Sequence, residues 1–159
     1  NFSLNAGEWK AVHSDHGFTL KATGGAVMLG QFLVSAGLIP EGRTGDPTFV
    51  VFPAAEQHRK EYTFLVPTTF SSNYMVLSKP QDAAITIDDQ ALGEFNGCTT
   101  APVGEVNGIV YDQITCELSE GAHRVGANKP FGLTVYGYYN VGSYGYPGGS
   151  DVKIINPIE

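Results

Sequence analysis

The stretch that decides the fold is Ile109–Tyr138, which reads IVYDQITCELSEGAHRVGANKPFGLTVYGY. Its first ten residues alternate, with Ile109 and Tyr111 on one face and Ile114 and Cys116 on the other, as in a β-strand. The turn-forming residues SEGAH then lead into a second strand-like run. A Lys-Pro pair separates that run from a third one, FGLTVYGY. None of the three runs has the spacing of an amphipathic helix, so the stretch predicts consecutive strands with short connections.

The same pattern extends through the earlier part of the chain. Strands are expected over five segments: Phe18–Ala22, Ala26–Val34, Thr48–Phe52, Glu61–Val66 and Tyr74–Leu77. Ala26–Val34 is an apolar run, which is typical of a strand buried on both faces. The letters ITIDDQALGEF predict a hairpin with a tight turn at Asp88–Gln90, and Ala54–Tyr62 allows a single helical turn at most. About ten strands without a long helix predict an all-β fold, a two-sheet, jelly-roll-like β-sandwich.

Length and charge narrow the classes of partner. The chain has 159 residues and a mass of 17.0 kDa, which fits one domain over residues 1–159. The net charge is −7 and the nine Lys and Arg residues are scattered. Nucleic acid is therefore not expected as a partner, because phosphate binding needs clustered basic side chains. No run approaches the roughly 20 apolar residues of a membrane span, so membrane insertion is not expected. Because the chain begins at Asn1 rather than Met, we expect a module excised from a larger protein.

The two cysteines of the chain are Cys98 and Cys116, and neither lies at metal-ligand spacing from a His or another Cys. They are expected to form a disulfide if the chain is extracellular and to remain buried free thiols if it is cytosolic. Closing a loop of this length stabilises a fold by about 3 kcal/mol in the chain-entropy model. Composition leaves both readings open.

Four segments carry a resemblance to a known family: GDPTFVVFPAAEQHRKEYTFLVP, ITIDDQALGEF, EGAHRV and PFGLTVYGYYNVGSYGYPGG. In this order and spacing they resemble the IgGFc-binding-protein N-terminal domain family. The looser segment FTLKATGGAVMLGQFLVS extends the resemblance, which then covers roughly Phe18–Gly149. The final Tyr-rich segment is the most specific of these matches.

This resemblance implies a secreted or cell-surface setting, because the family occurs as modules of large mosaic extracellular proteins, often near adhesive or mucus-associated domains. It is not an enzyme family, so no catalytic residues are expected. In that setting Cys98 and Cys116 are expected to pair. The family takes its name from antibody binding by one mucosal member. No residue of this sequence identifies antibody binding as an activity of this chain.

The acidic and histidine side chains form no convergent catalytic set in the sequence. Asp88-Asp89 is the only adjacent acidic pair; turn chemistry is expected there, and a calcium site is the alternative. His13 and His16 lie three apart without a third His or Cys nearby, so a loop or a strand end is expected rather than a metal site. His58 and His123 are expected in surface turns, the second with a structural hydrogen bond.

The stretch Tyr136–Gly149 holds five Tyr and five Gly in fourteen positions, which raises the question of a binding platform. Alternation places Val135 in the core and leaves room at Gly137 for a ring or a second backbone. Structural roles are expected for three tyrosines, with a turn over the last of them: Tyr136, Tyr144 and Tyr146. Ligand contact is expected at three others, because Tyr is favoured in binding surfaces and the family motif constrains these positions less: Tyr138, Tyr139 and Asn140.

Together these observations predict a non-catalytic extracellular adhesion or recognition module that binds a protein or a glycan. One alternative is a structural spacer or tip module without a ligand of its own. Another is a calcium-dependent lectin-like domain, and calcium is the one cofactor considered. No feature of the sequence specifies an oligomeric state.

Overall fold

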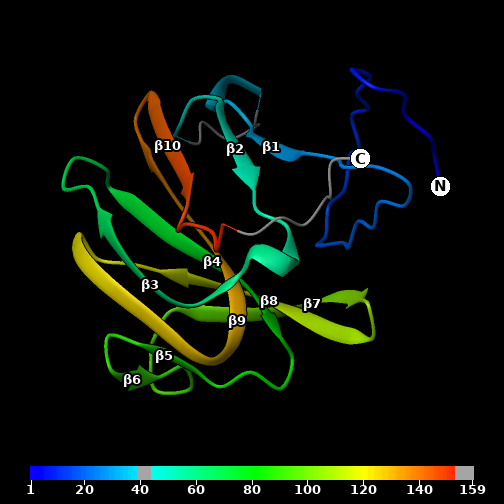
Figure 1. The fold of residues 1–159 in the computed structure, drawn as a ribbon. Helices are drawn as coiled ribbons and strands as arrows, with labels where there is room; N and C mark the ends of the chain where they lie inside the picture. The colour runs from blue at the N-terminus through cyan, green and yellow to red at the C-terminus, as the bar shows by residue number, and fades with distance from the viewer. Residues whose placement is uncertain (39–43, 153–159) are drawn as a thin grey trace.

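The computed structural model describes residues 1–38 and 44–152, and the fold is all-β (Figure 1). The elements follow in this order: β1 (Leu29–Leu33), η1 (Ala36–Leu38), β2 (Thr48–Phe52), η2 (Ala55–Gln57), β3 (Arg59–Val66), β4 (Ser72–Pro80), β5 (Ile85–Ile87), β6 (Gln90–Ala91), β7 (Cys98–Val106), β8 (Ile109–Glu117), β9 (Gly121–Tyr139) and β10 (Gly142–Pro147). β1 and β2 form a small sheet, and the other strands form a larger one in the order β6-β5-β9-β4-β8-β7, with β3 and β10 also paired to β9. The predicted all-β, two-sheet architecture is confirmed.

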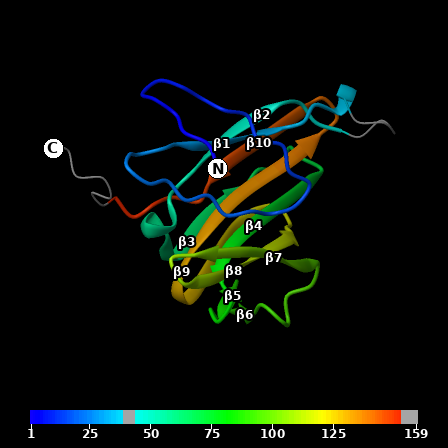
Figure 2. The same ribbon diagram turned by 90° about the vertical axis from the view of Figure 1, so that its right-hand side faces the viewer.

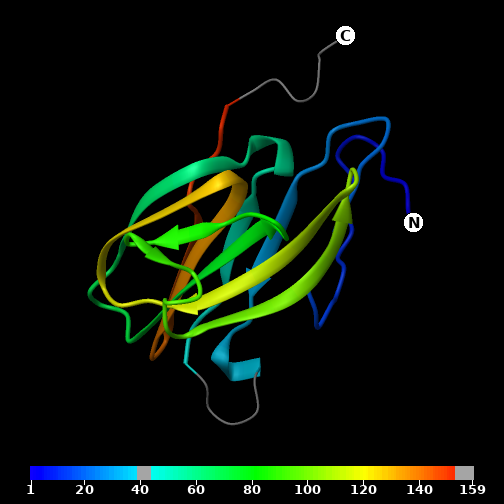
Figure 3. The same ribbon diagram turned by 90° about the horizontal axis from the view of Figure 1, so that it is seen from below.

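Strand β9 folds the larger sheet into two layers. Its residues 121–127 pair with β3 and β5, whereas residues 132–139 pair with β4 and β10. Pro130 lies at the bend between these halves, outside the registered pairs, so its missing backbone N–H breaks no ladder bond. The Lys-Pro pair therefore bends one long strand and does not separate two. Figures 1 and 3 show β9 curving from yellow to orange between the two layers.

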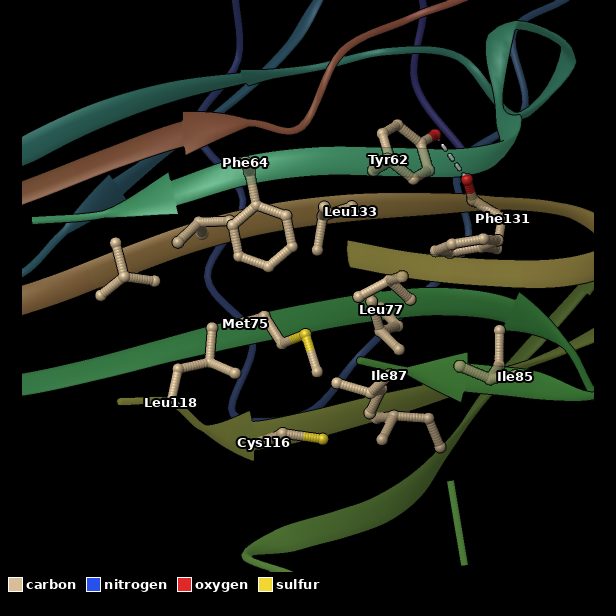
Figure 4. Packing of buried hydrophobic residues seen from close by; sticks show 14 residues of the cluster. Tyr62, Phe64, Met75, Leu77, Ile85, Ile87, Cys116, Leu118, Phe131 and Leu133 are labelled. Atoms are coloured by element: carbon tan, nitrogen blue, oxygen red, sulfur yellow. Dashed lines mark hydrogen bonds between the residues drawn. The ribbon is translucent and has the colours of Figure 1, made fainter. Parts of the chain in front are cut away.

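The hydrophobic core fills the space between these layers (Figure 4). Its buried cluster contains fourteen residues: Tyr62, Phe64, Val66, Met75, Leu77, Ile85, Ile87, Ile114, Cys116, Leu118, Val125, Phe131, Leu133 and Val135. At the bend of β9, the Tyr62 hydroxyl donates a 2.6 Å hydrogen bond to the Phe131 carbonyl, and the two rings meet edge to face at 5.0 Å. This contact joins β3 to the point where the sheet turns over.

The Cys98–Cys116 disulfide is present, as expected for an extracellular module. The two residues stand opposite each other in the antiparallel β7–β8 pair, with Cα atoms 4.0 Å apart. Cys116 is fully buried, whereas Cys98 belongs to the edge strand β7. The bond therefore fastens an edge strand to the core.

The region before β2 departs from the predicted strands. Phe18–Ala22 forms no strand, and Ala26–Val34 shortens to β1, which pairs only with β2. β1 is not buried on both faces, since every residue in it is exposed or only half-buried. Met28 and Phe32 are 80% and 71% exposed. Figure 2 shows β1 and β2 lying over β10, beside the irregular N-terminal segment (blue).

The Tyr-rich end forms a strand where a turn was expected. Tyr144 of β10 stands opposite Gly137 of β9, and Tyr146 stands opposite Val135. A Cβ atom at Gly137 would lie 2.5 Å from Cε1 of Tyr144, so the predicted close approach at this glycine is confirmed. Residues 144–147 continue the ladder because an edge of β9 is free to pair with them. The Gly-rich sequence alone does not show that such an edge is present.

Candidate functional site

The candidate site lies at the tip of the β9–β10 hairpin. Tyr139 pairs with Gly142, which leaves Asn140 and Val141 as the two residues of the connection. Tyr139 is 54% exposed and Val141 is 71% exposed, and Asn140 is exposed between them. The tip thus presents an aromatic ring, an amide and an aliphatic side chain on a convex end of the molecule. Val141 was not predicted as a contact residue, although it stands inside the quoted stretch beside Asn140.

Tyr138 behaves differently from the two residues that follow it. Its ring is half-buried and meets Tyr136 edge to face at 5.7 Å, and Tyr136 stacks on Tyr74 of β4 at 5.2 Å. Burial raises the pKa of Tyr136 to about 12, with smaller contributions from Tyr138 and Tyr74. The three rings form a row on the face of the sheet away from the core. Of the three predicted contact residues, the structure therefore brings Tyr139 and Asn140 to the exposed tip and places Tyr138 inside this aromatic row.

The opposite face of the hairpin is fixed by tyrosine hydroxyl groups. Tyr144 donates to Oδ1 of Asn73 at 2.9 Å, and Tyr146 donates to the Leu65 carbonyl at 2.7 Å. The rings of Tyr144 and Phe70 meet edge to face at 4.7 Å. Burial raises the pKa of Tyr144 to about 12, with a smaller contribution from Tyr146. Both tyrosines have the structural roles that the sequence predicts for them.

A backbone contact from before β2 holds the tip in place. The Gly45 N–H donates to the Asn140 carbonyl at 3.0 Å, and the Asp46 N–H donates to Oγ of Ser143 at 2.9 Å. Gly45 has φ of +113°, and a Cβ atom there would lie 2.5 Å from Cδ1 of Tyr138. Only glycine fits this position without strain, so the backbone behind the tip is closely packed.

The acidic pair of the β5–β6 hairpin has a structural role. Asp88 and Asp89 have φ of +48° and +65°, as a two-residue turn between Ile87 and Gln90 requires. The Asp88 carboxylate bonds the His123 ring at 2.7 Å through one oxygen and accepts the Arg124 N–H at 2.8 Å through the other. The turn chemistry predicted for this pair is confirmed. His123 has the predicted structural hydrogen bond but lies buried inside β9 rather than in a surface turn.

His58 is also buried, contrary to the expected surface turn. It follows η2 and is 8% exposed, and its Nδ1 has no hydrogen-bond partner. Burial lowers its pKa to about 4, and the nearby Glu56 carboxylate opposes that shift only in part. The ring is therefore neutral at pH 7. It lines a groove of about 580 Å³, together with Tyr111 and Pro130.

The remaining chemical candidates lie apart from one another. His16 bonds Asp15 at 2.6 Å, and both side chains are exposed in the N-terminal loop, where His13 is exposed as well. Within residues 1–38 and 44–152, no group of three or more His, Cys, Asp or Glu side chains is placed to hold a metal ion. No helix in that part of the chain has the length and hydropathy needed to cross a bilayer.

A sequence model of the family described as IgGFc binding protein matches residues 1–137. The chain belongs to the IgGFc-binding protein family. The match contains β1 to β8 and most of β9, and it ends at Gly137, so the hairpin tip and β10 lie outside it. No curated protein and no solved structure matches the chain.

Membership of the IgGFc-binding family indicates an extracellular, protein-binding module. The Cys98–Cys116 disulfide agrees with this setting, because disulfides persist in oxidising compartments. The family match assigns no contact residue to this chain. Which surface of the module meets a partner has to be argued from the geometry.

Proposed function

We propose that this chain is a non-catalytic adhesion or recognition module of a secreted or cell-surface protein, and that it binds a partner through the β9–β10 hairpin tip. The observation that carries the proposal is the exposure of Tyr139 and Val141 on a connection whose backbone is held by Gly45. A large, exposed aromatic side chain gains contact area with little loss of conformational entropy. Convex tips of this kind suit contact with another macromolecule better than enclosure of a small molecule.

Tyr138 supports the tip in this proposal as well as bordering it. Its ring packs against Gly45 and Tyr136, so it holds the hairpin end at a fixed angle while part of its surface stays accessible. Tyr139 and Asn140 supply the direct contacts. The partner is a protein surface, in keeping with the family, or a glycan displayed on one.

The test is retention of the purified domain on immobilised extracellular matrix, mucus and cell surfaces, measured for the wild type, Tyr139→Ser and Leu65→Ser. Leu65 is a matched control because its side chain is 65% exposed on β3 and only its backbone carbonyl is bonded to the hairpin, through Tyr146. Loss of retention in Tyr139→Ser alone supports the proposal. If no surface retains the wild type, the spacer alternative replaces it.

A further inference from the structure

The small β1–β2 sheet has one face turned toward β10 and one face turned away from it. Val50 is 4% exposed, and a Cβ atom at Gly145 of β10 would lie 2.6 Å from its Cγ2 atom, so Val50 marks the inner face. Figure 2 shows this layer lying over β10. Side chains alternate along a strand, so the residues next to Val50 and those paired with them form the outer face. These are Gly30, Phe32, Phe49 and Val51.

The large side chains of this outer face are apolar and exposed. Phe32 is 71% exposed, Phe49 is 51% exposed and Val51 is 37% exposed. Alternation extends the face by one residue on either side of β1, to Met28 and Val34, which are 80% and 53% exposed. An apolar surface of this kind is typical of a site that contacts another macromolecule.

The two aromatic rings of the outer face are held against the sheet. Their centroids lie 4.6 Å apart, and Phe32 stands opposite Phe49 in the β1–β2 pair. The Phe49 ring also covers Gly30, where a Cβ atom would lie 2.2 Å from Cζ. The rings are therefore already packed on each other and on the backbone before a partner arrives, which lowers the entropy cost of binding one.

The outer face belongs to a part of the chain that carries no charge. Residues 22–38 and 47–55 contain no Asp, Glu, Lys, Arg or His, although the whole chain has a net charge of −7. Two copies of such a chain repel each other over most of their surfaces. A twofold contact brings the same residues of both copies together, so an uncharged face can meet itself without a like-charge contact.

The exposed area of the outer face is close to what a dimer requires. Aromatic side chains present roughly 200 Å² each when fully exposed, so the exposed fractions of these five side chains correspond to about 500 Å² per copy. Two copies that cover these faces bury about 1,000 Å² in total, the lower limit for a specific interface. An interface of this size predicts a reversible dimer rather than a permanent one.

We propose that the outer face of the β1–β2 sheet packs against the same face of a second copy of this chain about a twofold axis. The Phe32–Phe49 pair of each copy lies at the centre, and Met28 and Val34 lie at the rim. This contact is separate from the hairpin tip and goes beyond the function proposed above. It joins two hairpin tips in one assembly.

The experiment is sedimentation velocity of the purified wild-type domain at about 1–500 μM, without any binding partner. The expected result is a rise with concentration from the 17.0 kDa monomer to twice that mass, with a Kd of about 1–100 μM. The Kd should fall by about threefold as NaCl is raised, because salt screens the repulsion between the two negative chains. A monomer at every concentration overturns the proposal, since something other than a second copy must then cover the face.

Two variants assign the association to the outer face. Met28→Glu changes a side chain that lies outside the strands and places two like charges in the interface, so the Kd should rise at least tenfold. Phe32→Ser should weaken the dimer by a similar factor. Leu65→Glu adds the same charge at a 65% exposed position of β3 and is the matched control.

The proposal is also overturned if Met28→Glu associates like the wild type, or if Leu65→Glu weakens the dimer as much as Met28→Glu does. Because Met28 makes no strand pairing, Met28→Glu decides the result even if Phe32→Ser fails to fold. No partner is present in these measurements, so their outcome is independent of whether the hairpin tip retains the domain on any surface.

Discussion

Gly137 is the residue on which the packing of the hairpin depends most directly. A Cβ atom there would lie 2.5 Å from Cε1 of Tyr144, 2.7 Å from Oδ1 of Asn73 and 2.8 Å from the Ser72 carbonyl oxygen. Gly137→Ala should therefore destabilise the fold by about 1–3 kcal/mol, as overpacked cores do. Urea unfolding measures this change.

Gly25→Ala is the control for that measurement, because a Cβ atom at Gly25 meets nothing within 4 Å. Its unfolding free energy should change by less than about 0.5 kcal/mol. Equal effects of the two substitutions would contradict the packing described for β9 and β10.

His58 makes stability depend on pH in a predictable direction. Its pKa is about 4 in the folded chain and 6.5 in an exposed reference state, so protonation favours the unfolded chain. The stabilising effect of the neutral buried ring is present above pH 6.5 and is lost as the pH falls from 6.5 to about 4. The loss amounts to about 3 kcal/mol at most.

Urea unfolding at pH 7.5 and pH 4 compares the wild type with His58→Gln, which has no titrating ring at this position. The wild type should lose more stability on acidification than the variant does. Identical losses in the two proteins would show that His58 is not buried in its neutral form.

Among the elements, the edge strand β7 is joined to β8 by its hydrogen-bonded ladder and, at one end, by the disulfide. Reduction of Cys98–Cys116, which closes a loop with a sequence separation of 18, should lower the unfolding free energy by about 3 kcal/mol. Denaturant midpoints with and without reductant measure the change. A thiol assay on denatured, unreduced protein should find no free Cys, and two free thiols would contradict the pairing.

The elements also show which features the sequence could predict. Thr48–Phe52 forms a strand over the predicted residues, and Tyr62, Phe64 and Val66 face the core, because alternation reports burial on one face of a paired strand. Phe18–Ala22 has the same alternation but remains irregular, because it finds no partner strand. The pairing of two strands depends on segments that are distant in sequence, so the local sequence of one strand does not determine it.

The same limit applies to the candidate site. The exposed position of Tyr139 and Asn140 agrees with the sequence, and contact with a partner at these residues stays a prediction. The burial of His58 could not be predicted, since its sequence neighbours are polar and the walls around it come from β4, β8 and the β9 bend. The segments that enclose such a group are known only once the fold is known.

The whole molecule presents two proposed contact surfaces, the hairpin tip and the outer face of the β1–β2 sheet. The acidic turn at Asp88 was the calcium site considered from the sequence. We propose no calcium binding there, because the Asp88 carboxylate already bonds His123 and the Arg124 N–H. The melting temperature should therefore be the same in chelator and in added calcium, as ligand linkage requires for a protein that binds none. A rise of several degrees with calcium would favour the lectin-like alternative.

The most direct test of the recognition module is the dissociation constant of Tyr139→Ser for the surface that retains the wild type. The ring is exposed at the tip and makes no core contact, so its loss should change binding without changing the fold. The account predicts a Kd at least about tenfold weaker, equivalent to about 1.4 kcal/mol, with Leu65→Ser unchanged. Equal Kd values for the wild type and Tyr139→Ser would contradict recognition through the hairpin tip.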